Sequence, residues 1–187
     1  MKKIITLTLT CITLSIQAQE TSVEKSTFGA QTGFLGIWVH NETRLSNNIA
    51  LRSEIGFDSG IWGGDFYDKT GFLLAPVLTI EPRFYYNLDK RHLKDKKTSN
   101  NNGNFFSLRT SYHPDWFVIS NTENVRIISD LSFVPTWGIR RNISNSNFVY
   151  EAGFGAGYQY VFAKQAGYRE NESHFLLNLH LRIGYSF

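Results

Sequence analysis

Cysteine is almost absent from this chain of 187 residues, which contains a single one, Cys11. Cys11 lies within the short apolar run Ile4–Ile16, which follows two lysines and precedes a plausible cleavage site after Ala18. This arrangement is typical of a secretory signal peptide. The alternative, an N-terminal anchor helix, would need about 20 apolar residues and the run is shorter. We therefore expect residues 1–18 to be cleaved, leaving a mature chain without disulfides or thiolate chemistry.

An excess of charge of one sign and long apolar runs are missing too. Lys and Arg number 19 and Asp and Glu 16, and the formal charge of +3 falls to +1 when Lys2 and Lys3 leave with the signal peptide. This balance argues against nucleic acid as a partner. After residue 18 no apolar run is long enough for a membrane-spanning helix. No segment shows sustained helical periodicity either.

The chain has instead a strict alternation of apolar and polar residues, which is clearest at its end. From Phe175 to Phe187 every second residue is apolar or aromatic, and Asn178, His180 and Arg182 lie between them. Successive side chains of a strand point to opposite faces, so this segment would have one apolar and one largely polar face. In a transmembrane barrel the apolar face meets lipid and the polar face lines the lumen.

Similar alternating segments recur along the chain, and high aromatic content, 15%, accompanies them. Their lengths suit transmembrane strands, which need about 9 to 11 residues when tilted, better than the 5 or 6 residues of a usual soluble strand. Residues 19–26 are polar and predict a flexible leader, so that 27–187 would form one outer-membrane barrel domain. The predicted strands are 27–39, 49–60, 71–88, 105–113, 125–140, 148–162 and 174–187.

These seven segments leave a problem of parity. A single-chain barrel that begins and ends on the same side needs an even number of strands, so we expect eight. The eighth would come either from Trp116–Ile119 or from a split within residues 27–60. The charged loop 89–104 is expected outside because periplasmic turns are usually short. There its basic part could contact lipopolysaccharide phosphates, although a solvated loop is the simpler interpretation.

Several charged residues fall on the predicted lumenal faces. The interior of an eight-stranded barrel is just wide enough to be filled by side chains, and unpaired buried charge is costly. We therefore predict a structural network of ion pairs and hydrogen bonds, with a proton or small-ion path as the alternative. Arg109 and Asn178 lie on the same faces. The predicted members are Arg52, Glu54, Glu81, Arg83, Asp130, Glu151, Gln159, His180 and Arg182.

Three stretches carry a resemblance to a known family. Ile80–Leu88 (IEPRFYYNL), Gly153–Tyr158 (GFGAGY) and the ending Arg182–Phe187 (RIGYSF) are similar to segments of the small outer-membrane β-barrel proteins of Gram-negative bacteria, with OmpA- and OmpX-type architecture. The resemblance implies an all-β fold: a single antiparallel up-and-down transmembrane barrel in the outer membrane. It also implies that Tyr185 and Phe187 belong to a signal read by the barrel-insertion machinery.

Catalytic motifs are missing as well. The sequence contains neither HExxH nor GxSxG, and its histidines and serines form no recognisable catalytic or metal-binding constellation. We therefore expect a monomeric, non-enzymatic barrel without cofactor or metal, which contacts outer-membrane lipid and lipopolysaccharide and has a structural or surface-interaction role. An enzyme that modifies lipid A or phospholipid and a small-ion pore are the alternatives. A soluble periplasmic barrel would need an apolar lumen, which the charged faces argue against.

Overall fold

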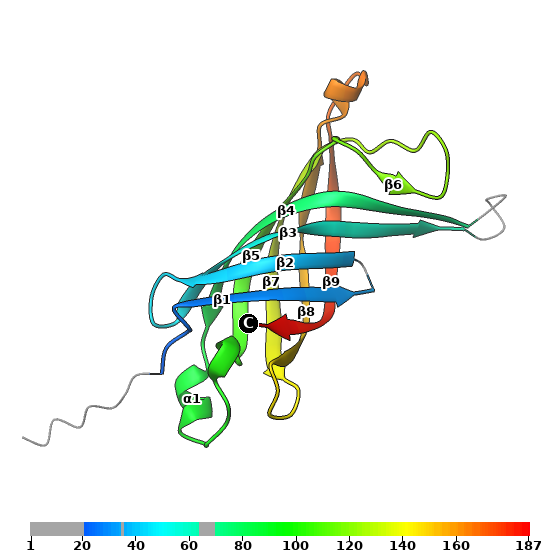
Figure 1. Ribbon diagram of the computed structural model, residues 1–187. Coiled ribbons are helices and arrows are strands. Elements are labelled where there is room, and N and C mark those ends of the chain that lie inside the picture. Colours follow the sequence, from blue (N-terminus) through cyan, green and yellow to red (C-terminus); the bar gives the residue numbers. More distant parts are fainter. Residues whose placement is uncertain (1–20, 35, 64–69) are drawn as a thin grey trace, which may run out of the picture.

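The computed structural model, which describes residues 21–34, 36–63 and 70–187, is one antiparallel sheet closed into a ring (Figure 1). Strands that follow one another in the ring pair side by side, and pairing of the first with the last closes the barrel. This confirms the predicted all-β, up-and-down barrel. The ring strands are β1 (Ser26–Gly33), β2 (Gly36–Arg44), β3 (Ile49–Trp62), β4 (Gly71–Tyr85), β5 (Asn104–His113), β7 (Asp130–Asn142), β8 (Phe148–Val161) and β9 (Glu172–Ser186).

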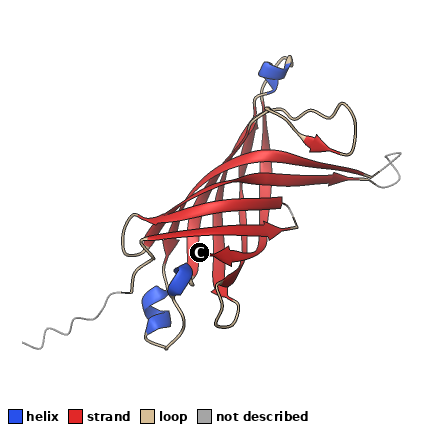
Figure 2. Cartoon of the chain, viewed as in Figure 1, coloured by secondary structure: helices blue, strands red, loops and turns tan. Residues whose placement is uncertain are grey.

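Helical structure is confined to loops in the described part of the chain (Figure 2). These helices are α1 (Leu88–His92), η1 (Ser99–Asn101) and η2 (Ala163–Ala166). No helix among the described residues is long and apolar enough to cross a membrane.

The strand that the sequence pattern did not locate comes from the split within residues 27–60. The predicted strand 27–39 is a hairpin, in which β1 and β2 pair from Gly33 opposite Gly36 to Ser26 opposite Thr43. Its two apolar faces are thereby explained, because the alternation starts again after the turn. β2 continues to Arg44, beyond the end of the predicted strand at residue 39. The other candidate, Trp116–Ile119, contributes one residue to β6 (Ile119–Ser120), which pairs with β4 outside the ring.

Gly36 makes this tight hairpin possible. Its φ is +147°, and a Cβ added there would lie 2.0 Å from the carbonyl oxygen of Phe57 on β3. We expect Gly36→Ala to lower the free energy of unfolding by more than about 1 kcal/mol, because both the backbone conformation and the space exclude a side chain. Gly167→Ala is the matched control, with φ of +93° and no heavy atom within 4 Å of the added Cβ.

Urea unfolding of the refolded barrel measures both variants. Equal losses for Gly36→Ala and Gly167→Ala would show that the close approach of β3 to Gly36 does not matter.

The two ends of the barrel differ. We call the end at which β1 begins and β9 stops the closed end; it also carries the connections 45–48, 86–103 and 143–147 (Figure 1). The open end carries the ends of β1 and β3 and the connections 114–129 and 162–171. The charged loop therefore lies at the end where β9 stops, because the extra strand precedes it in the chain. It folds into the barrel mouth, and we call residues 86–103 the cap.

This cap forms a small apolar core at the closed end. Val23, Ala50, Tyr85, Leu88 and Phe105 are buried against one another. Backbone bonds hold the segment around Val23, whose N–H donates to the Asn47 carbonyl at 2.8 Å. Val23, which lies within the predicted leader 19–26, is completely buried. The predicted signal peptide, 1–18, lies outside the described residues.

The open end is splayed. The pairing of β9 with β1 stops at Arg182 opposite Gly33, whereas its pairing with β8 continues to Glu172. The β3–β4 and β8–β9 hairpins therefore extend beyond the short β1–β2 hairpin and diverge (Figure 1).

Candidate functional site

The centre of the barrel is filled by charged side chains that are removed from solvent. Two glutamates face three arginines here. Glu151 accepts bonds from Arg140 at 2.8 Å, from Arg83 at 3.2 Å and from Arg52 at 3.3 Å. Glu42 accepts bonds from the same three guanidinium groups at 3.0 to 3.3 Å. All five side chains have no solvent exposure, so each charge depends on the others for its stabilisation.

Further polar groups complete this central cluster. His180 Nε2 lies 2.9 Å from a Glu151 oxygen, and the Gln31 amide donates to Glu151 at 3.0 Å. The Tyr85 hydroxyl and the Asn101 amide donate to Glu42 at 3.1 and 2.7 Å. Asn101 belongs to the cap, so the closed end is hydrogen-bonded directly to the charges inside the barrel.

A second layer of ion pairs lies against the first. Glu54 accepts bonds from Arg52 and Arg182, both at 2.6 Å, and from Arg109 at 2.9 Å. Glu81 bonds Arg83 at 2.9 Å and the Ser107 hydroxyl at 2.6 Å. We call the two layers together the lumenal network. Its ionic members come from β2, β3, β4, β5, β7, β8 and β9, and β1 joins through Gln31, so that it connects the whole ring.

A separate cluster lies nearer the open end. His113 Nδ1 is 3.0 Å from Asp130 and its Nε2 is 3.1 Å from Asp58. Carboxylates only accept hydrogen bonds, so both contacts require an N–H on each ring nitrogen. Trp38 donates to Asp58 at 2.7 Å, and the Arg182 guanidinium lies 3.6 Å above the Trp38 ring. The cluster links β3 with β5 and β7 across the barrel.

The structure places most predicted members in the lumenal network. Asp130 belongs instead to the His113 cluster. Gln159 is half-buried towards the open end and joins neither cluster among the described residues. Seven predicted residues do come together, namely Arg52, Glu54, Glu81, Arg83, Glu151, His180 and Arg182.

The sequence reasoning missed several members. Glu42 falls between the predicted strands 27–39 and 49–60, but it continues the inward row of Trp38 and His40 once the hairpin is recognised. Arg140 lies on the polar face of its predicted strand and could have been included. Asn101 lies in an irregular loop, and no periodic pattern marks it.

Catalytic geometry is not evident in the described part of the chain. No serine hydroxyl there hydrogen-bonds a histidine, and no group of three or more His, Cys, Asp or Glu side chains there is arranged to hold a metal ion. Asp58, His113 and Asp130 are linked to one another and to Trp38, without an activated nucleophile beside them.

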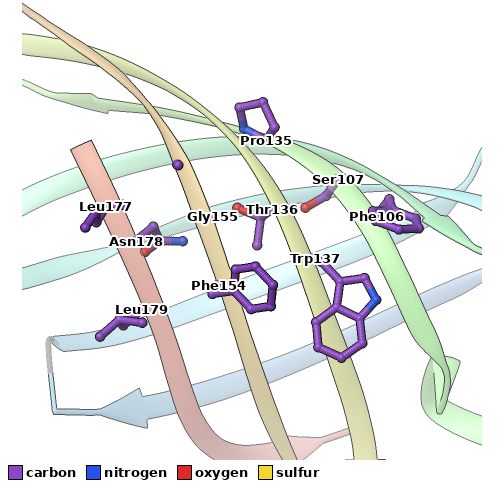
Figure 3. A pocket seen from close by; sticks show the side chains of 11 residues that line it. Phe106, Ser107, Pro135, Thr136, Trp137, Phe154, Gly155, Leu177, Asn178 and Leu179 are labelled. Carbon is purple, nitrogen blue, oxygen red and sulfur yellow. The ribbon is translucent and has the colours of Figure 1, made fainter. Parts of the chain in front are cut away.

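One hollow in the described surface is a groove of about 990 Å³ across β5, β7, β8 and β9 (Figure 3). Pro135 and Ala156 lie between outward-facing apolar side chains, among them Trp137, Phe154 and Leu177. Polar residues of the lumenal rows also border it, but Ser107 is engaged with Glu81 inside the barrel. The groove therefore offers few polar groups that could orient a small molecule.

Comparison with known proteins gives no match: no family model, curated protein or solved structure is detectably similar to this chain.

Proposed function

We propose that the chain is an integral outer-membrane β-barrel with a sealed lumen and a non-enzymatic structural or surface-interaction role. One observation carries the proposal: the two faces of the sheet have the polarity opposite to that of a water-soluble protein. Arg52, Arg83 and Glu151 are fully buried inside, whereas Leu179 and Leu181 on the outside are 71% and 69% exposed. In water this arrangement would be costly on both faces, and in a bilayer the outer face is satisfied by lipid.

Aromatic residues support the same assignment. At the closed end the Tyr86 and Phe106 rings lie 5.3 Å apart, and Trp137 Nε1 donates to the Tyr86 hydroxyl at 3.0 Å. The Tyr185 ring lies 5.1 Å from Phe148 and 5.2 Å from Phe187. Amphipathic rings of this kind form girdles at the interfaces of transmembrane barrels. Tyr185 and Phe187 thereby face outward, where barrel-insertion machinery could recognise them, as we also propose.

The lumen favours a sealed barrel over a small-ion pore. The lumenal network occupies its centre with buried side chains, and Leu88 and Asn101 of the cap are buried below it. An ion would have to break several mutually dependent ion pairs to pass. No observation favours the lipid-modifying enzyme.

Cell fractionation tests the proposal. The full chain expressed in a Gram-negative host should be found in the outer membrane, resist extraction by carbonate, and migrate faster on gels before boiling than after it. Recovery from the soluble periplasmic fraction would overturn the membrane assignment. A changed lipid A or phospholipid acyl pattern in expressing cells, by mass spectrometry, would overturn the non-enzymatic role while leaving the location intact.

A further inference from the structure

Positive charge is concentrated at the closed end, on residues that do not belong to the lumenal network. The cap and its neighbouring turns present many more basic than acidic residues. The acidic residues are Glu24, Asp89 and Asp95; Glu42 is buried in the network. The basic residues are Lys25, Arg44, Lys90, Arg91, Lys94, Lys96, Lys97 and Arg141.

The open end does not share this excess. Its described connections hold Arg126, Lys164 and Arg169. Acidic residues there are equally numerous, namely Asp115, Glu123 and Glu170. The positive charge is therefore a property of one end of the molecule and not of its loops in general.

The cap has a defined fold that leaves its lysines outward. The Arg91 guanidinium donates to the Lys97 carbonyl and to Asn102, both at 2.9 Å, and Arg141 donates to the Gly103 carbonyl at 2.8 Å. The guanidinium groups of these two arginines therefore hydrogen-bond residues of the cap. Lys90, Lys94 and Lys96 are exposed, and no carboxylate among the described residues forms an ion pair with them.

The position of these lysines relative to the aromatic girdle indicates their partner. Tyr86 of the girdle is separated from Lys90 by three residues, and α1 follows it at the closed end of the barrel (Figure 1). Leu93, which is 83% exposed, lies among the lysines. An exposed leucine within a basic segment at this depth suits the boundary between acyl chains and headgroups. Lysine side chains can reach the phosphates from there while their aliphatic parts stay at the interface.

We propose that Lys90, Lys94 and Lys96 form a basic rim that binds the headgroups of anionic glycerophospholipids, in the leaflet at the closed end. The inference rests on the proposed function, because only a membrane-embedded barrel brings this leaflet to the rim. The sequence suggested lipopolysaccharide as the lipid partner of this loop. The inference proposes phospholipid instead, in the leaflet at the closed end. Charge complementarity favours this occupant, since clustered cations next to a membrane attract anionic lipids.

The association of spin-labelled lipids with the refolded mature chain tests the rim. In phosphatidylcholine vesicles the wild-type barrel should prefer spin-labelled phosphatidylglycerol to spin-labelled phosphatidylcholine, and high salt should weaken this preference. In the triple variant Lys90→Glu, Lys94→Glu and Lys96→Glu this preference for phosphatidylglycerol should fall by at least about fivefold. That factor corresponds to the contribution of one cation near the membrane surface. The control Arg126→Glu, Lys164→Glu and Arg169→Glu changes three exposed cations at the open end and should keep the wild-type preference.

Heat-modifiable migration of every sample shows that the barrel has folded. A folded rim variant with the wild-type lipid preference would overturn the inference and leave the proposed function standing. An equal loss in both triple variants would also overturn it, by showing that net charge and not the rim sets the preference. Failure of the wild-type chain to enter vesicles of either lipid would overturn the proposed function, and the rim with it.

Discussion

Glu151→Gln should lower the free energy of unfolding by about 3 to 5 kcal/mol, the cost of breaking a buried ion pair by removing one partner. Glu151 faces Arg52, Arg83 and Arg140, and Glu42 would be left as the shared partner of all three. Because glutamine has nearly the same volume, the loss reports charge and not packing. Urea unfolding in detergent or in vesicles, followed by tryptophan fluorescence and gel migration, measures it.

A matched variant separates this effect from a general effect of removing an acidic residue. Glu172→Gln changes a carboxylate at the edge of β9 whose side chain is 55% exposed and contacts His174. It should stay within about 0.5 kcal/mol of the wild type, as exposed ion pairs usually do.

A second substitution tests whether the network acts as a unit. Adding Arg140→Gln to Glu151→Gln removes one of the uncompensated guanidinium groups, so the two losses should not add and the coupling energy should exceed about 1 kcal/mol. A loss below about 1 kcal/mol for Glu151→Gln alone would contradict a tightly paired network and indicate that water fills the lumen.

The sequence predicted those parts of the network that follow from strand alternation. Once β3, β4, β8 and β9 are recognised, period two assigns Arg52, Glu81, Glu151 and Arg182 to one face without knowledge of their partners. In a narrow ring, residues on that face must meet, because the interior has no room for them to avoid one another.

The parts that the sequence did not predict depend on contacts between distant residues. The turn between β1 and β2 follows from the close approach of β3 to Gly36, and no turn motif marks it. Asn101 meets Glu42 across 59 positions of the chain, and an irregular loop has no period from which its facing could be read. The length of the charged loop reflects its folding into the barrel mouth, which no pattern in the sequence marks.

The lumenal network and the cap together explain why so many charges can be buried in so small a protein. Each guanidinium group of Arg52, Arg83 and Arg140 contacts at least two carboxylates. Two or more ion pairs therefore offset the free-energy cost of removing each group from water. The cap limits access of water from the closed end through Leu88 and Asn101. Stability of the barrel therefore depends on the completeness of the network more than on any one pair.

The outer face provides the second large prediction. Leu181→Arg should destabilise the barrel by about 2 to 4 kcal/mol in vesicles, the range for an arginine on the lipid face near the bilayer midplane. Leu181 lies midway along the apolar row from Phe175 to Phe187 on β9 and is 69% exposed. In a water-soluble protein such an exposed leucine could be replaced by arginine at almost no cost, because few packing contacts are lost.

Leu93→Arg is the control for this substitution, because it makes the same chemical change at a still more exposed site. Leu93 lies among the lysines of the basic rim, where our proposal places headgroups and water around an additional cation. Its effect should remain within about 0.5 kcal/mol. Equal and small effects at both positions would contradict a lipid-facing β9, whereas a large loss at Leu181 alone would be the energetic signature of the inverted polarity of this sheet.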